Sequence, residues 1–179
     1  LAWVWARNKN APVAKRLRVL TLVTLFLTFD LVIFGSFTRL TDSGLGCPDW
    51  PGCYGSASPV GAQLHIEAAQ SAMPTGPVTH SKAWIEMIHR YLATGVGVLI
   101  LTLTLVTWLA RRDQLRKRSG GDEQSPSATL SPWWPALTLA WVCLQGAFGA
   151  LTVTMKLFPA IGPMPLLCGL CLLSLLRAQ

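Results

Sequence analysis

The run LATGVGVLILTLTLVTWLA, from Leu92 to Ala110, contains no charged residue. A helix needs about 20 mostly apolar residues to cross the hydrocarbon core of a bilayer. Three further runs approach or reach that length, so the sequence predicts an all-α protein that crosses a membrane several times, as a four-helix bundle. In the fourth run, glycine and proline residues crowd the start, and proline breaks helical hydrogen bonding. The expected spans are residues 19–38, 83–110, 133–153 and 157–176.

Charged residues are scarce for a water-soluble protein. They make up 13% of the 179 residues, whereas a soluble domain carries about 25%. The formal net charge is +7, and most of the positive residues lie in two blocks, 7–18 and 111–118, each beside an apolar run. This pattern is typical of the cytoplasmic side of a membrane protein. We therefore expect contact with membrane lipid and no nucleic acid partner.

The distribution of Lys and Arg also predicts an orientation. Eleven lie in the segments before the first span, between the second and third spans, and after the fourth, whereas three lie in the other connections. Because the positive side faces the cytoplasm, both termini are expected there. The expected connections are a cytoplasmic N-terminal segment, a long outer loop and a cytoplasmic loop, at residues 1–18, 39–82 and 111–132.

The outer loop is much longer than a usual connection, which indicates a functional role. It contains the run GCPDWPGCY at residues 46–54, in which proline and glycine predict tight turns between Cys47 and Cys53. An oxidising outer compartment such as a bacterial periplasm favours a disulfide between them. A metal site is the alternative, although structural zinc takes four ligands. Residues 65–70 are expected to form a short helix.

Glu86 and His89 are the strongest local indication of chemistry. Their i, i+3 spacing places them on one face of a helix, and ionisable groups inside a span mark functional sites. A neutral imidazole on such a helix can bind a haem iron. The alternative is that Glu86, His89 and Arg90 lie at the membrane surface among water and head groups. Asp30, near the middle of the first span, is expected to face the bundle interior or to be protonated.

Three motifs resemble those of bacterial heme A synthases. The run TRLTDSGLGCPDWPGCYG at residues 38–55 resembles the first outer loop of that family. KAWIEMIHRY at 82–91 resembles the start of its second helix, and QGAFGALTV at 145–153 the end of its third. The motifs occur in the family's order, and the resemblance covers nearly all of this chain but about the first half of the family's usual length.

The resemblance implies a membrane enzyme that oxidises the C8 methyl group of heme O to the formyl group of heme A. Such enzymes have eight helices in two similar halves, and this chain corresponds to the N-terminal, substrate-binding half. The resemblance implies that His89 ligates the haem iron, that Glu86 is the catalytic carboxylate, and that Cys47 and Cys53 form the loop's disulfide. Arg39 is implied more weakly, as a haem-binding partner of a propionate.

The resemblance also implies cofactors and partners. Heme O is the expected substrate, with heme b expected in the C-terminal half, and heme O synthase and that half are expected partners. The protein would lie in a bacterial inner membrane, with residues 39–82 in the periplasm. One position departs from the family, because Pro165 stands where a second haem-ligating histidine is expected. A non-catalytic haem-binding module and an inactive, truncated remnant are therefore the alternatives to an enzyme.

Overall fold

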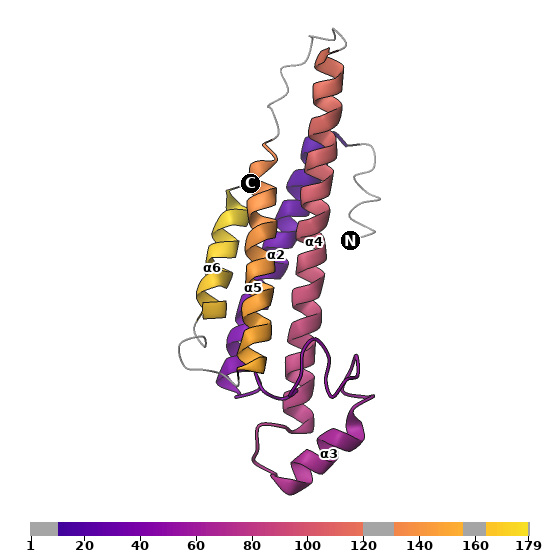
Figure 1. Ribbon diagram of the computed structural model, residues 1–179. Helices are drawn as coiled ribbons and strands as arrows, with labels where there is room; N and C mark the ends of the chain where they lie inside the picture. The colour runs from indigo at the N-terminus through magenta and orange to yellow at the C-terminus, as the bar shows by residue number, and fades with distance from the viewer. Residues whose placement is uncertain (1–10, 120–130, 156–163, 179) are drawn as a thin grey trace.

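The computed structural model of the chain describes residues 11–119, 131–155 and 164–178. Three of its helices are long and apolar enough to cross a membrane, and a shorter apolar helix follows them. The prediction of an all-α membrane bundle is confirmed for these residues (Figure 1). The helices are α2 Val13–Leu40, α3 Gln63–Ala72, α4 His80–Ser119, α5 Trp133–Thr154 and α6 Met164–Arg177.

Four of the helices pack side by side, and chain neighbours run in opposite directions (Figure 1). Helix α2 contacts α4 and α6, and α5 contacts the same two helices from the other side. The apolar core between them consists of residues spaced three or four apart, which is the spacing of one helix face. Its buried members are Leu17, Leu20, Val96, Leu99, Ile100, Leu103, Leu172 and Leu176.

Threonine side chains are buried among these apolar residues, and carbonyl oxygens of the same helix accept hydrogen bonds from their hydroxyl groups. Thr24 Oγ1 donates to the carbonyl of Leu20 at 2.8 Å, and Thr28 Oγ1 to that of Thr24 at 2.7 Å. A polar group inside a membrane needs a partner within the protein. These bonds along the helix let threonine fill the core without an unpaired hydroxyl.

Helix α6 is the shortest of the four packed helices. Its 14 residues extend for about 21 Å, which is less than the roughly 30 Å of a hydrocarbon core. Trp141 Nε1 donates to the carbonyl of Cys168 at 2.9 Å and holds α6 against α5. Of the expected fourth span, residues 157–163 lie outside the described residues, and the boundaries of the whole expected span remain a prediction.

Asp30 lies on the exposed side of α2. The expectation that it faces the bundle interior is therefore wrong for the helices that the structure describes. The cause is the helical phase of α2, because the core-facing positions Leu20, Thr24 and Thr28 lie on another face. A carboxylate facing lipid is costly, so protonation of Asp30 remains our prediction.

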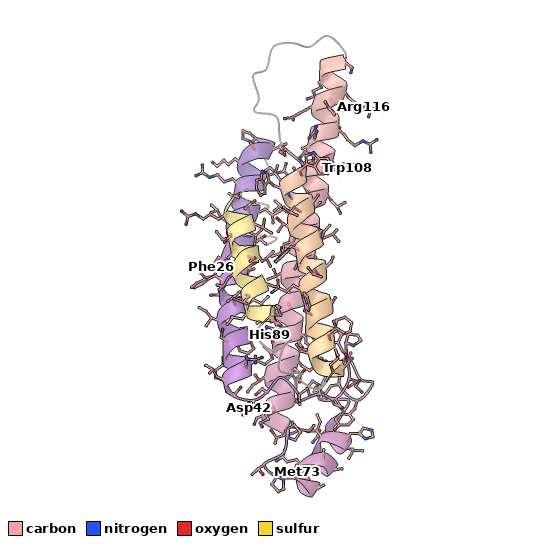
Figure 2. The ribbon with its side chains drawn as sticks, turned by 60° about the vertical axis from the view of Figure 1, so that its left-hand side comes forward. Phe26, Asp42, Met73, His89, Trp108 and Arg116 are labelled. Atoms are coloured by element: carbon pink, nitrogen blue, oxygen red, sulfur yellow. A yellow bond between two sulfur atoms is a disulfide. The ribbon has the colours of Figure 1, made fainter. Side chains whose placement is uncertain are left out.

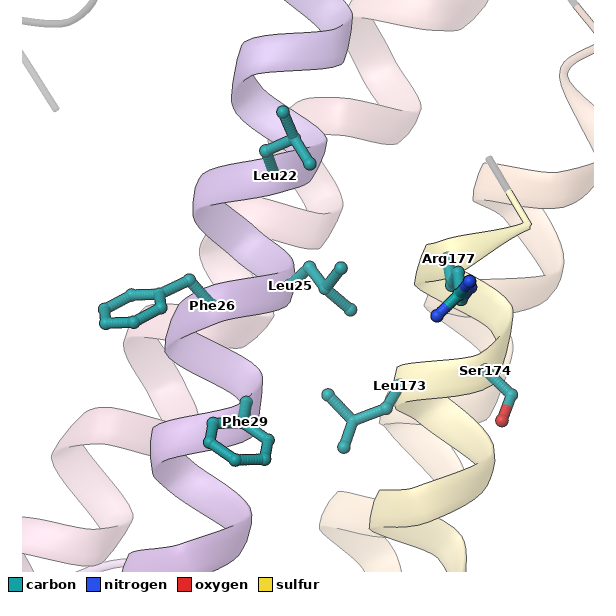
Figure 3. A pocket seen from close by; sticks show the side chains of 7 residues that line it. All are labelled: Leu22, Leu25, Phe26, Phe29, Leu173, Ser174 and Arg177. Carbon is teal, nitrogen blue, oxygen red and sulfur yellow. The ribbon is translucent and has the colours of Figure 1, made fainter.

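A shallow apolar groove lies between α2 and α6, where side chains of both helices line it (Figure 3). Its volume is about 440 Å³, and it is lined by Leu22, Leu25, Phe26, Phe29, Leu173, Ser174 and Arg177. None of these residues belongs to the sites expected from the sequence. The groove therefore lies apart from the Glu86 and His89 pair.

Candidate functional site

The outer loop folds back onto the first turn of α4. Cys47 and Cys53 are joined by a disulfide, with sulfur atoms 2.09 Å apart, and both residues are fully buried. Gly46 lies so close to α4 that a Cβ atom there would stand 2.5 Å from the carbonyl oxygen of Lys82. Only glycine permits this approach. The disulfide-closed loop, residues 47–53, is thus seated directly on the start of the helix that carries Glu86 and His89.

Asp49 fixes the shape of this loop from within. Its carboxylate accepts a hydrogen bond from the backbone N–H of Tyr54 at 2.6 Å and another from Gly55 at 2.7 Å. The ring of Tyr54 stacks on His65 of α3, with centroids 5.3 Å apart. The short helix expected at residues 65–70 is confirmed as part of α3. The loop is therefore an ordered element with its own internal bonds.

Glu86 is buried beneath the loop, with 4% of its surface exposed. One carboxylate oxygen accepts the backbone N–H of Cys47 at 2.8 Å, and the other lies 2.6 Å from Nη2 of Arg90. A buried carboxylate needs such partners, because an unpaired buried charge is very costly. Glu86 and Arg90 pair with each other and with protein backbone.

Arg90 contacts the same loop through its other terminal nitrogen. Nη1 lies 2.9 Å from the carbonyl oxygen of Asp49 and 3.3 Å from that of Pro51, and it also bonds to the carbonyl of Gly52. A guanidinium has five N–H donors in a rigid plane. One side chain therefore joins a carboxylate on α4 to several backbone carbonyls of the loop.

His89 lies in the seam between α4 and α2. Its ring lies beside Phe34 at 6.3 Å between centroids, with the planes 17° apart. Its Nε2 atom lies 2.9 Å from the point where a Cβ on Gly35 would stand. Figure 2 shows His89 in the half of the bundle that carries Asp42 and Met73, away from Trp108 and Arg116. The imidazole thus has room only because α2 has a glycine there.

The other candidate residues from the sequence lie in α2, α3, α4 and α6. Arg39 is exposed in the last turn of α2, four residues beyond Gly35. Pro165 lies in the first turn of α6, where its carbonyl accepts Nε2 of Gln145 at 3.3 Å. His65 and His80 are exposed. Among the described residues, no group of three or more His, Cys, Asp or Glu side chains is placed to hold a metal ion.

Two contributors to this arrangement were missed by the sequence analysis. Arg90 is named in the sequence analysis only in the alternative that places it with Glu86 and His89 at the membrane surface, although its i, i+4 spacing from Glu86 predicts an ion pair on one helix face. Gly35 gave no sequence signal, because its importance depends on the side chain that α4 places opposite it. The arrangement combines a fixed carboxylate with an imidazole one turn away, which can serve a proton transfer and the ligation of a metal-bearing group.

Comparison of the sequence with known proteins identifies the family of this chain. Residues 18–179 match the COX15-CtaA family, described as cytochrome oxidase assembly protein. The chain is 39% identical over 154 residues to the heme A synthase of Shewanella oneidensis, covering 86% of this chain and 42% of that protein. It is 30% identical to a heme A synthase of Rhizobium etli, covering 83% of this chain and 39% of the relative.

A heme A synthase of Lysinibacillus sphaericus is 27% identical over 148 residues, covering 83% of this chain and 38% of its own length. No solved structure gives a significant match. The chain spans less than half the length of these relatives. On the extent of the family match and on the similarity to these relatives, the chain belongs to the heme A synthase family.

Proposed function

We propose that this chain binds heme O in the membrane and takes part in its conversion to heme A. The observation that carries the proposal is the pair of Glu86 and His89 on one helix, one fixed under a disulfide-closed loop and the other turned into the bundle. Membership of the heme A synthase family supports the choice of haem as the ligand. The proposed location is a bacterial inner membrane, with both termini in the cytoplasm.

The donor chemistry of His89 fits a haem iron, because a neutral imidazole nitrogen is a common axial ligand. The Nε2 atom faces Gly35 of α2. Ligation by this nitrogen therefore requires the imidazole to turn away from α2 or the two helices to separate. Arg39, exposed at the end of α2, is proposed to pair with a haem propionate as an arginine does with carboxylates.

Glu86 is proposed as the group that accepts a proton during oxidation of the C8 methyl group to a formyl group. With water as the proposed oxygen source, that change releases four protons and four electrons, and the electrons would have to pass to an acceptor, which this proposal assigns to the C-terminal half with its heme b. Arg90 and the N–H of Cys47 hold the carboxylate in one orientation. A carboxylate that is held in one orientation before the reaction loses no further conformational entropy when the reaction takes place.

One observation favours a second candidate, a haem-binding module that does not complete the reaction alone. Pro165 offers no side-chain donor in α6, so the ligand opposite His89 is missing from the position where the resemblance expects it. We propose that heme A formation also needs a C-terminal half with its heme b, and heme O synthase as the supplier of heme O. Heme-binding without heme A formation by residues 1–179 would support this candidate.

The test is haem binding by the purified chain in detergent, with iron protoporphyrin IX as the probe. His89→Ala should abolish binding, whereas His65→Ala, at an exposed histidine of the same outer region, should leave it unchanged. Equal binding by the wild-type chain and His89→Ala would contradict the proposed ligand. Glu86→Gln should retain binding, because the carboxylate does not ligate the iron in this proposal.

A further inference from the structure

We propose that Arg90 is a positioning residue that fastens the disulfide-closed loop, residues 47–53, to Glu86, so that the loop and the carboxylate move as one unit. The idea rests on the proposed function only in assigning Glu86 a role toward haem. Its structural basis is independent of haem, because it consists of contacts within the chain itself.

The first observation is that Arg90 bridges two parts of the chain that are far apart in sequence. Nη2 pairs with Glu86 one turn away on α4, while Nη1 bonds to loop carbonyls about 40 positions earlier. The planar guanidinium addresses the two sides through two separate nitrogens, whereas a lysine would offer a single nitrogen. The bridge is therefore a property of arginine rather than of positive charge alone.

The second observation is that the loop also contacts the Glu86 carboxylate directly, without Arg90. The N–H of Cys47, at the first half-cystine, donates to Glu86 at 2.8 Å. Glu86 thus contacts the loop directly through Cys47 and indirectly through Arg90. The two connections close a ring of contacts that includes the disulfide, so loss of any one member should loosen the others.

The third observation is the burial that this ring produces. Both half-cystines and Met87 are fully buried or nearly so, and Met87 also contacts Arg90, with Sδ 3.7 Å from Nη1. The sulfur atoms are thus shielded from a water-soluble reductant as long as the loop stays seated. Accessibility of the disulfide therefore measures whether the loop is fastened.

The first experiment measures the rate at which a membrane-impermeant phosphine reduces the Cys47–Cys53 disulfide in the haem-free chain of residues 1–179. Arg90→Gln should raise this rate about tenfold or more, because hydrogen bonds to a charged group contribute roughly 1.5–3 kcal/mol. Arg90→Lys should raise it nearly as much, because lysine keeps the charge but cannot form the bridge. Arg112→Gln, at an exposed arginine beside Trp108 on the same helix, should leave the rate unchanged.

A wild-type reduction rate in Arg90→Gln would overturn the proposal, and full rescue by Arg90→Lys would overturn the bridging role. If Arg90→Gln does not accumulate in the membrane, Arg90→Lys supplies the same comparison with Arg112→Gln. Because no haem is present, this result is separate from the fate of the proposed haem function.

The second experiment tests whether Arg90 acts through Glu86. With iron protoporphyrin IX bound, the absorption spectra of Arg90→Gln and Glu86→Gln should shift alike, and the double variant should shift no further. Non-additivity is expected because Glu86→Gln removes the carboxylate that Arg90→Gln leaves without its ion pair, so the second change has nothing further to act through. Additive shifts would show that Arg90 affects the site independently of Glu86 and would contradict its positioning role.

Discussion

The Nε2 atom of His89 on α4 lies 2.9 Å from the point that a Cβ on Gly35 of α2 would occupy. A side chain at residue 35 would therefore meet the imidazole, and either the His89 ring or one of the two helices would have to shift. The proposed haem ligand is thus placed by a residue that contributes no atom beyond its backbone.

Gly35→Ala is expected to destabilise the α2–α4 packing by about 1–3 kcal/mol, the usual cost of overfilling a well-packed interior. Thermal unfolding in detergent, followed by circular dichroism, measures the change. Gly95→Ala is the matched control, since a Cβ at that helical glycine meets nothing within 4 Å. Equal stability of Gly35→Ala and the wild-type chain would contradict the observed packing.

The disulfide of the outer loop predicts a pattern of thiol reactivity. In intact, unreduced membranes, Cys47 and Cys53 should remain unlabelled by a thiol reagent until a reductant is added, because a disulfide has no free thiolate. Mass spectrometry of the peptide containing both residues measures the labelling. Modification of either cysteine without reductant would rule out the bond in the cell.

The proposed orientation predicts opposite reporter signals from the outer loop and from the C-terminal end of α4. A fusion at Ser119 should report the cytoplasm and a fusion at Ser58 the periplasm, because the positive blocks are retained on the cytoplasmic side. Alkaline phosphatase and fluorescent protein fusions give complementary readings. A reversed pattern would place Glu86 and His89 in the other leaflet.

Because Asp30 lies within a membrane-spanning segment, we expect its replacement by an apolar residue to favour membrane insertion of α2. Asp30→Leu should favour membrane insertion of α2 by about 2.5–3.5 kcal/mol, the cost of aspartate at the centre of a membrane helix. An insertion reporter carrying residues 11–40 measures the difference, and Thr102→Leu, at an exposed position of α4, is the control in its own segment. Lower yield of the folded chain with Asp30→Leu would instead indicate that a protein partner contacts this carboxylate.

Pro165 predicts that residues 1–179 cannot make heme A alone. Expressed in a strain lacking heme A synthase, the chain should give no heme A in the extracted haems. Pro165→His should tighten haem binding, because it supplies a donor from α6, yet it should not restore heme A. Heme A from the unaltered chain would show that this expectation is wrong.

The fold was predictable where the physical constraint is local. Long apolar runs such as Leu92–Ala110 need only their own composition to indicate a membrane helix, and the structure confirms the all-α class. The side on which a residue lies is harder, because it depends on which neighbours a helix meets. Asp30 shows this, since its exposure follows from the phase that α2 adopts against α4 and α6.

The candidate site was predictable in its residues and less so in its connections. The spacing of Glu86 and His89 indicates a shared helix face, and the loop prolines indicate tight turns near the cysteines. Nothing in the sequence places the N–H of Cys47 on Glu86 or three loop carbonyls on Arg90, because these contacts join segments about 40 positions apart. Such long-range pairs arise only when the loop folds back onto α4.

In the proposed membrane orientation, the unbroken length of α4 would also set how deep the site lies. Glu86 and Trp108 are 22 positions apart on one helix, or about 33 Å at 1.5 Å per residue, which is close to the thickness of the hydrocarbon core. Trp108, with Arg112 stacked on it at 4.7 Å, has the chemistry that anchors a helix at one membrane surface. The length of α4 therefore fixes the distance between Glu86 and Trp108. Removing one turn between these residues would bring Glu86 and its loop about 5 Å closer to the lipid interior.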